Sequence, residues 1–218
     1  MKILLKYNLI FILLFSLNST CQSNKSLSGG IYNISNFIAS DYFSTLKRNN
    51  TDLELVDTIY LRALKYFDND ISEALLALTF ATLPFNKMPL KLPIIDVTLN
   101  IPLPSVSDSL FNLKVKNLPS QLFFDSPKVE FGDKDKVPHF FGNAFLSYSI
   151  SLFNISEFLG ILVELFEDSF KIEGRLDLRD LYINRLGSFY GEILDDKPEL
   201  LPSEMFLIYS IIHNGINL

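Results

Sequence analysis

The amino-acid sequence predicts a mainly α, bundle-like domain of about six helices with a short extended β arm or hairpin in the middle. Apolar residues recur at helical spacing before residue 84 and again after residue 135. Between these two parts, residues 84–127 hold seven of the ten prolines. Within this segment, residues 95–103 alternate apolar and polar side chains with a period of two, which is typical of a strand. A chain of 218 residues is long enough for one domain with a sizeable core.

The first twenty residues have the three parts of a secretory signal peptide. Lys2 and Lys6 supply a positive start, residues 9–17 (LIFILLFSL) form an apolar run, and residues 18–20 are small and polar. The apolar run is too short to cross a hydrocarbon core of about 30 Å, which takes about 20 residues. We therefore expect residues 1–20 to be a cleaved signal peptide that exports the chain.

Cys21 is the only cysteine, so it cannot form a disulfide within the chain. Residues 17–21 (LNSTC) resemble a relaxed bacterial lipobox, which implies a lipid anchor on Cys21. Gln22 is not an inner-membrane retention signal, so the resemblance implies the outer membrane, facing the periplasm. Residues 21–30 would then be a lipid-anchored, flexible tether. The alternative is cleavage near Thr20, which gives a soluble periplasmic or secreted protein.

Residues 31–130 are expected to hold the N-terminal helices and the proline-rich β arm. The first helix is predicted over residues 34–47. Thr51 and Glu54 have the pattern of a capping box and open the second helix. Asp70 and Glu73 repeat this signal before the third helix, which Pro84 ends.

The β arm is predicted from the alternation over residues 95–103, with a second short strand over residues 113–115. Pro102 cannot donate a hydrogen bond to a neighbouring strand, so this strand belongs at an edge. Residues 93–104 are therefore the exposed edge that we expect to contact another envelope protein or lipid.

Residues 131–218 are predicted to form a C-terminal helical region. The expected helices cover residues 138–153, 155–170, about 177–194, and a last segment that Ser203 opens and Gly215 ends. Asn154 and Glu157 form a cap signal that divides the apolar stretch 137–166 into two helices of about sixteen residues, each about 24 Å long. Each of these is too short to span a bilayer.

The charge balance excludes one class of partner. Removing the two leader lysines from the 19 basic residues leaves 17 against 25 acidic residues. Nucleic acid is held mainly by Lys and Arg contacts to phosphate, so an acidic chain is not expected to bind it.

Three sequence pieces follow one another in the C-terminal half. They read D-K-x-x-H-F from residue 135, G-x-x-x-E-x-x-E-D from residue 160, and R-x-D-x-x-D-L-x-x-N-x-x-G-x-x-x-G from residue 175. In this order they resemble the VanZ-like family and the YfiM-type lipoproteins, over roughly residues 133–194. The resemblance implies an envelope protein without established chemistry. The lipoprotein leader makes the YfiM-type comparison the closer one, although Asn143 stands where those sequences usually place a small residue.

The same pieces contain the candidate site. An antiparallel neighbouring helix could bring His139 close to Glu167 or Asp168. His139, Glu164 and Asp168 are the candidate catalytic residues, as a general acid or base or as ligands of a metal whose identity the sequence leaves unknown. The structural alternative is a hydrogen-bonded histidine near a helix start. The remaining motif residues have structural interpretations as ion-pair partners, helix caps and a small-x-x-x-small packing face: Lys136, Arg175, Asp177, Asp180, Asn184, Gly187 and Gly191.

Three functional hypotheses remain open from the sequence. The first is a structural or interaction lipoprotein of the cell envelope that contacts an envelope protein or lipid, with no cofactor predicted. The second is an envelope hydrolase or metal-dependent enzyme centred on His139 with Glu164 and Asp168. The third is a membrane-embedded VanZ-like protein that spans the bilayer through residues 137–170. No phosphate-binding loop, nucleophile motif or Cys/His zinc spacing supports the second hypothesis.

Overall fold

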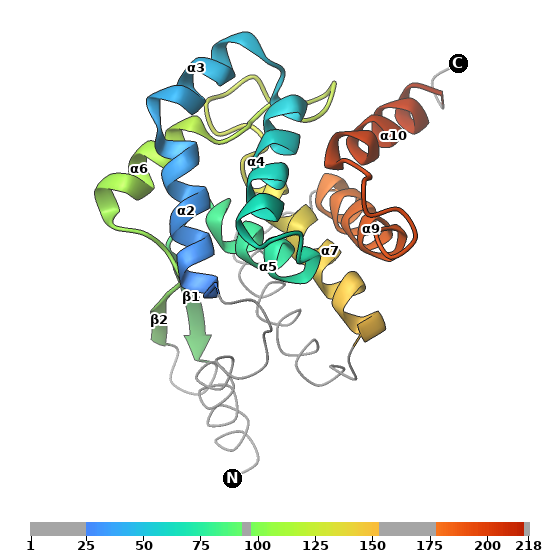
Figure 1. Cartoon of the computed structure of the whole chain (residues 1–218). Coiled ribbons are helices and arrows are strands. Elements are labelled where there is room, and N and C mark those ends of the chain that lie inside the picture. Colours follow the sequence, from blue (N-terminus) through green and yellow to red (C-terminus); the bar gives the residue numbers. More distant parts are fainter. Residues whose placement is uncertain (1–24, 93–96, 153–177, 216–218) are drawn as a thin grey trace.

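The computed structural model describes residues 25–92, 97–152 and 178–215, and these are mainly helical, as predicted. Figure 1 shows the helices stacked around one another, with a two-stranded hairpin at one end. The described elements, with their bounds, are α2 (Leu27–Ala39), α3 (Asp41–Asn49), α4 (Asp52–Tyr66), α5 (Ile71–Ala81), β1 (Lys87–Leu92), β2 (Val97–Pro102), α6 (Asp108–Asn117), α7 (Lys136–Leu152), α9 (Leu178–Ile193) and α10 (Pro202–Gly215).

Two helix starts lie where the sequence places them. The Thr51 side chain accepts a hydrogen bond from the Glu54 amide, and the Glu54 carboxylate accepts one from the Thr51 amide. This reciprocal capping box opens α4. Asp70 caps α5 in the same way, by accepting a hydrogen bond from the Glu73 amide. Both cap predictions are confirmed.

The first predicted helix is corrected in its middle and at its start. Residues 34–47 are not one helix, because Ser40 ends α2 and its side chain accepts a hydrogen bond from the Phe43 amide to start α3. The helix also starts earlier than predicted: Ser26 caps α2, so the last four residues of the predicted tether 21–30 form its first turn. Gly30 is buried there, and an added Cβ would overlap the ring of Phe67. The short polar stretch before α2 resembles a linker in composition, but its Ser26 caps the helix.

The predicted strand over 95–103 is largely confirmed as β2, and it pairs antiparallel with β1. The second strand predicted over residues 113–115 is wrong, since this segment belongs to α6. The buried residues of α6 are Phe111, Lys114 and Asn117, which recur every three residues. Two of these three side chains are polar, so a search for regularly spaced apolar residues does not detect the buried face of this helix.

The C-terminal helices lie close to their predicted bounds. α7 begins at Lys136, two residues earlier than expected, and α9 and α10 match the segments 177–194 and 203–215. The helix predicted over 155–170 lies outside the described residues, as do the leader and Cys21. Within the described ranges, none of the helices is both long enough and apolar enough to span a membrane.

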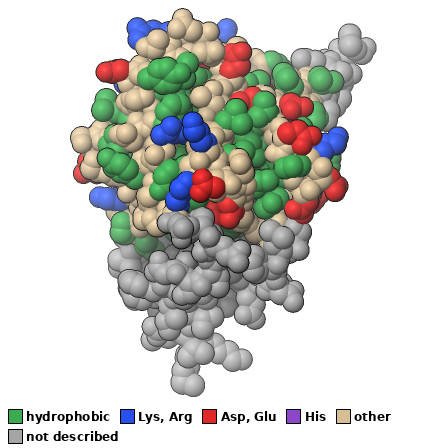
Figure 2. Space-filling model, in the orientation of Figure 1, with side chains coloured by type: hydrophobic (Ala, Val, Ile, Leu, Met, Phe, Trp, Pro, Cys, Tyr) green, Lys and Arg blue, Asp and Glu red, His purple; other side chains and the backbone are tan. Residues whose placement is uncertain are grey.

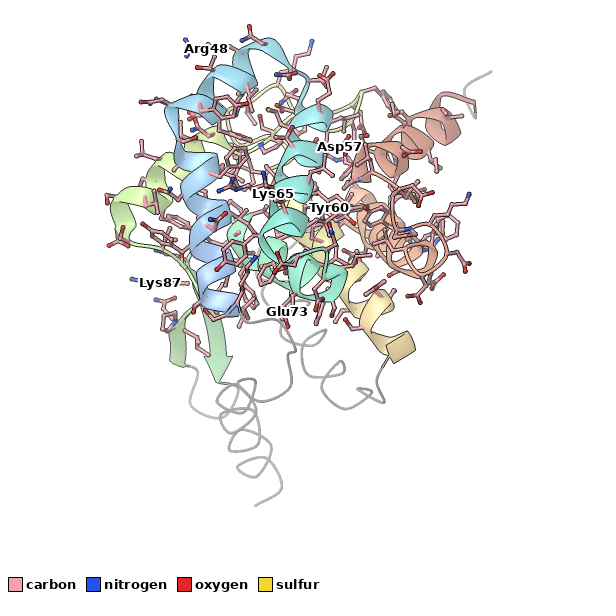
Figure 3. The ribbon with its side chains drawn as sticks, in the orientation of Figure 1. Arg48, Asp57, Tyr60, Lys65, Glu73 and Lys87 are labelled. Atoms are coloured by element: carbon pink, nitrogen blue, oxygen red, sulfur yellow. The ribbon has the colours of Figure 1, made fainter. Side chains whose placement is uncertain are left out.

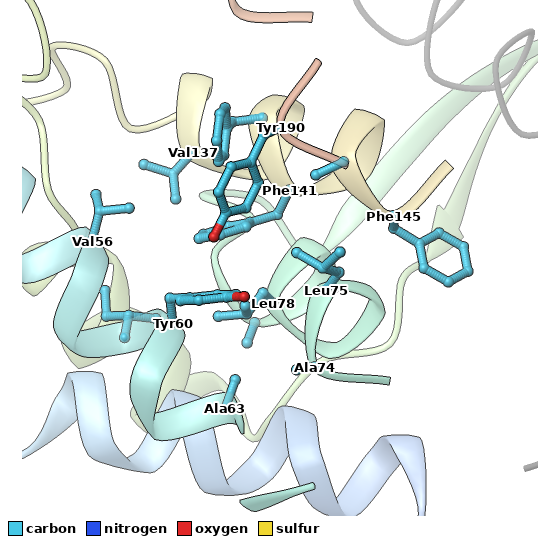
Figure 4. Packing of buried hydrophobic residues seen from close by; sticks show 14 of the residues in the cluster. Val56, Tyr60, Ala63, Ala74, Leu75, Leu78, Val137, Phe141, Phe145 and Tyr190 are labelled. Carbon is cyan, nitrogen blue, oxygen red and sulfur yellow. The ribbon is translucent and has the colours of Figure 1, made fainter. Parts of the chain in front are cut away.

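One hydrophobic core joins the two regions that the sequence analysis separated at residue 130. Tyr60 of α4 stacks on Phe141 of α7 with ring centroids 6.3 Å apart, and its ring meets Tyr190 of α9 edge-on at 5.9 Å. Figure 4 shows these rings together with Leu75 and Leu78 of α5. The core therefore holds α7 and α9 in fixed positions against the N-terminal helices. On the outer face shown in Figure 2, acidic and basic side chains are interspersed with hydrophobic ones.

Candidate functional site

The candidate site is the contact between α7 and α9, which run side by side in the same direction. Asp180, Asn184, Gly187 and Gly191 are spaced by four, three and four residues, so they form one stripe along α9. This stripe faces α7 along its whole length. The predicted motif D-x-x-x-N-x-x-G-x-x-x-G is thus the face by which α9 packs on α7.

An ion pair lies at the first turn of both helices. The Lys136 ammonium is buried and binds the carboxylate of Asp135 at 2.9 Å and also that of Asp180. Burial alone would lower the pKa of Lys136, but the two adjacent carboxylates outweigh it and raise this pKa. The charged form of Lys136 is therefore favoured, and it ties the start of α7 to the start of α9.

His139 lies one turn further along, and only 7 % of its surface is exposed. Its Nδ1 is 3.1 Å from Oδ1 of Asn184, and the same oxygen accepts a hydrogen bond of 2.9 Å from Nδ2 of Asn143. Because an amide oxygen only accepts, Nδ1 of His139 carries the proton. Asn143 also donates to the His139 carbonyl at 2.8 Å.

Burial sets the protonation state of His139. It lowers the pKa of the imidazole, while the nearby carboxylates of Asp180 and Asp135 raise it by less. His139 is therefore neutral at pH 7. A neutral imidazole with a fixed tautomer has the chemical form of a general base, but it is also the form of a structural hydrogen-bond donor.

Gly187 and Gly191 bring the two backbones together beyond this polar layer. An added Cβ at Gly187 would overlap the carbonyl oxygen of Phe140, and one at Gly191 would overlap that of Ala144. No larger residue fits at either position without moving a helix. Such close approach is what a small-x-x-x-small face permits.

A second buried charge cluster was missed by the sequence analysis. Asp133 is fully buried, and its carboxylate accepts hydrogen bonds from Arg179 at 2.9 Å, from the Leu122 amide at 3.3 Å and from the Ser126 hydroxyl. Burial raises the pKa of Asp133, and these donors oppose the increase. Gly132, at φ +50°, makes the turn that places Asp133 here. Nothing in the spacing of this loop could have identified the cluster, because its members come from three separate segments.

The structure thus brings together part of the predicted set. Lys136, His139, Asp180, Asn184, Gly187 and Gly191 meet at one interface. The proposed partners Glu164 and Asp168, and also Arg175 and Asp177, lie outside the described residues. Among the residues that are described, no group of three or more His, Cys, Asp or Glu side chains is arranged to hold a metal ion.

Comparison with known proteins assigns no family to this arrangement. No protein-family model, curated protein or solved structure matches the chain.

Proposed function

We propose that this chain is an exported, lipid-anchored protein of the cell envelope with a structural or interaction role. The observation that carries the proposal is the bonding of His139. Its protonated nitrogen is directed to Asn184, within a layer of side chains that joins α7 to α9. A histidine that holds two helices together in a buried position is poorly placed to meet a substrate.

Exposed apolar side chains support an interaction role. A binding module needs apolar surface that its own core does not use. Leu207 and Ile211 lie one turn apart on α10 and are 50 % and 71 % exposed. Phe124, 55 % exposed, lies with its ring centroid 6.4 Å from that of Tyr209 on the same helix.

The envelope location rests on the sequence. The leader, the lipobox-like segment before Cys21 and the resemblance to YfiM-type lipoproteins all favour a chain held at the outer membrane. The partner would be an envelope protein or lipid, and no cofactor is part of the proposal.

The anchor is tested by substituting Cys21. We expect mass spectrometry of the mature N-terminal peptide to show a diacylglyceryl group on Cys21. The Cys21→Ala variant should lose this group and enter the soluble fraction on carbonate extraction. An unmodified cysteine would overturn the anchor, whereas a Cys21→Ala variant that resists carbonate would favour the membrane-embedded VanZ-like alternative.

The enzyme hypothesis keeps one favourable observation, the neutral protonation state of His139. If His139 with Glu164 and Asp168 formed a metal-dependent hydrolase, the wild type would bind Zn²⁺ tightly and the His139→Ala and Asp168→Asn variants would not. We expect calorimetric titration with Zn²⁺ to give the same weak heats for all three proteins. Tight binding in the wild type alone would favour the enzyme.

A further inference from the structure

Helix α10 carries apolar side chains on two opposite faces. The members of its inner face are buried: Pro202, Met205, Phe206 and Tyr209. The members of its outer face are exposed, by 50 % at Leu207, 38 % at Ile208 and 71 % at Ile211. Each residue turns a helix by about 100°, so these two sets lie on opposite sides of the helix axis. A helix that is hydrophobic all round is normally buried, so the outer face predicts a covering surface.

The rest of the described chain packs on the inner face of α10. The Phe206 ring lies 4.8 Å from that of Phe140 on α7, and the Tyr209 ring lies 5.5 Å from that of Tyr182 on α9, measured between centroids. Figure 1 shows α10 at the margin of the molecule, next to α4 and α9. The outer face, with its exposed leucine and isoleucines, is directed away from these contacts.

Acidic side chains surround the start of the outer face. Glu204 shares this face, because it stands three and seven residues before Leu207 and Ile211. The chain from residue 192 to residue 204 holds five acidic residues and one basic residue. Figure 2 shows acidic side chains gathered over α9 and α10, beside hydrophobic ones. All five acidic residues of this stretch are exposed: Glu192, Asp195, Asp196, Glu199 and Glu204.

The loop between α9 and α10, which carries three of these acids, is held in place. The Tyr190 hydroxyl donates a hydrogen bond to the Leu200 carbonyl at 2.8 Å. The ion pairs found among the described residues join other groups, and none of them neutralises Glu192, Asp196 or Glu199. A fixed acidic loop beside an apolar stripe is complementary to a partner that is both basic and apolar.

We propose that the outer face of α10 binds an amphipathic helix of another envelope protein, with lysine or arginine beside the apolar stripe of that helix. This inference rests on the proposed interaction role and names the chemistry of the partner. The partner's apolar stripe covers Leu207, Ile208 and Ile211, whose spacing of three and four residues is that of a helix–helix seam. Its basic residues approach the acidic loop. Like charges oppose the two other occupants, an anionic lipid surface and a second copy of this acidic chain.

The test uses the mature full-length protein in a neutral detergent and two synthetic peptides. Each peptide is a helix of about four turns with leucine along one face. The basic peptide carries lysine beside this face, and the acidic peptide carries glutamate at the same positions. We expect fluorescence anisotropy to show binding of the basic peptide alone, with an affinity that falls as the salt concentration is raised.

Matched variants locate the binding. Leu207→Ser and Leu113→Ser remove leucines of nearly equal exposure, 50 % and 52 %, from α10 and from α6. Leu207→Ser should weaken binding about tenfold, because it removes a central apolar anchor, and Leu113→Ser should leave the affinity unchanged. Asp196→Asn should weaken binding and reduce its salt dependence, whereas Asp41→Asn, at an exposed position of α3, should change neither. Because both leucines are exposed, thermal unfolding should show equally folded proteins.

The other outcomes overturn this docking site. Binding of both peptides or of neither, or an equal effect of Leu207→Ser and Leu113→Ser, would exclude it. A dimer that Leu207→Ser dissociates, seen by light scattering, would assign the outer face to a second copy. Flotation of the Cys21→Ala protein with anionic vesicles, abolished by Leu207→Ser, would assign it to lipid. Binding of the basic peptide by a wild type with an unmodified Cys21 would overturn the anchor and keep the docking site.

Discussion

Asn184 satisfies two buried donors with one oxygen atom. His139 and Asn143 both point to its Oδ1, at 3.1 and 2.9 Å. Asn184→Ala would leave both donors without this acceptor, and each lost buried bond costs about 1–3 kcal/mol. We expect the Asn184→Ala variant to have a lower free energy of unfolding in urea by an amount in this range. Asn184→Asp is the control, because it retains the accepting oxygen.

The contrast between these two variants decides the role of the layer. An Asn184→Ala protein as stable as wild type would contradict a structural function for the contact. If Asn184→Ala loses stability and Asn184→Asp does not, the effect is due to hydrogen bonding and not to side-chain volume.

The motif identified these residues, but not their partners. His139 and Asn184 are both visible in the sequence, yet the sequence analysis paired His139 with carboxylates of the segment 155–170. Helical spacing shows which residues of one helix share a face, and it does not show which other helix that face meets. The contact between α7 and α9 depends on the position of both helices on the common core.

Lys114 is a buried residue whose pKa is shifted by its surroundings. Its ammonium donates to the Leu83 carbonyl at 2.8 Å and lies 4.6 Å from the centroid of the Phe111 ring. Burial lowers the pKa of Lys114 to about 7. The unfolded chain retains an ordinary lysine pKa of about 10.4, so between these two values the unfolded state binds more protons.

This pKa difference predicts a specific pH dependence. The contribution of Lys114 to stability is fully present above the unfolded pKa, decreases as pH falls, and is lost once pH has passed through about 7. We expect the free energy of unfolding of the wild type to rise between pH 7 and 10 more steeply than that of Lys114→Met. Lys116→Met removes an exposed lysine from the same helix and should keep the wild-type slope. Equal slopes in all three proteins would contradict the buried state of Lys114.

At the scale of elements, the two α9 glycines control how closely α7 and α9 approach. A Cβ at Gly187 would overlap the Phe140 carbonyl oxygen, which belongs to helix backbone and cannot turn aside. Overpacking of this kind costs about 1–3 kcal/mol. We therefore expect Gly187→Ala to lower the midpoint of thermal unfolding.

A glycine on α7 provides the matched control. A Cβ at Gly142 would meet only Thr79, at 3.4 Å, which is an ordinary contact distance. Alanine is favoured over glycine in a helix interior by about 1 kcal/mol. Gly142→Ala should therefore leave the midpoint unchanged or raise it. A rise in both variants would show that α9 can move without cost.

Element prediction succeeded where a local signal exists. Side-chain caps are local, and the cap signals at Thr51 and Asp70 both open helices. The break at Ser40 and the helical state of residues 113–115 were missed for a different reason. Ser40 ends one helix and starts the next within a continuous apolar pattern, and Lys114 places a charge on the buried face of α6. Tertiary contacts determine both the break at Ser40 and the helical state of residues 113–115.

At the scale of the whole molecule, α4 connects distant parts of the chain through its carboxylates. Asp52 accepts hydrogen bonds from the amides of Ser120 and Gln121, each at 2.6 Å. Asp57 accepts one from the Ser203 amide at 2.8 Å, across 146 residues of sequence. Figure 3 shows Asp57 and Tyr60 on the side of α4 that faces α10 and α9. A helix of the first third of the chain therefore supplies a cap for the last helix.

The contact of Asp57 with Ser203 makes a contribution to stability that depends on pH. Burial raises the pKa of Asp57, although the bonds to Ser203 oppose the increase. The folded state then binds the proton more tightly than the unfolded state, so this contribution to stability is present at acid pH and is lost as pH rises through the folded pKa. Asp57→Asn keeps an accepting oxygen and removes the titration. Its stability relative to wild type should therefore increase as pH rises from 3 to 7.

Asp57→Ala separates the charge from the hydrogen bond. It leaves the Ser203 amide without its acceptor at every pH, which costs about 1–3 kcal/mol when the donor is buried. We expect Asp57→Ala to be less stable than Asp57→Asn across the whole range, as measured by urea unfolding at each pH. If Asp57→Asn were the less stable at pH 7 and recovered in acid, the charged carboxylate would be the favourable form. The contact between α4 and α10 would then depend on the attraction of the Asp57 carboxylate to the N-terminus of α10, and not on a hydrogen bond to a neutral carboxyl group.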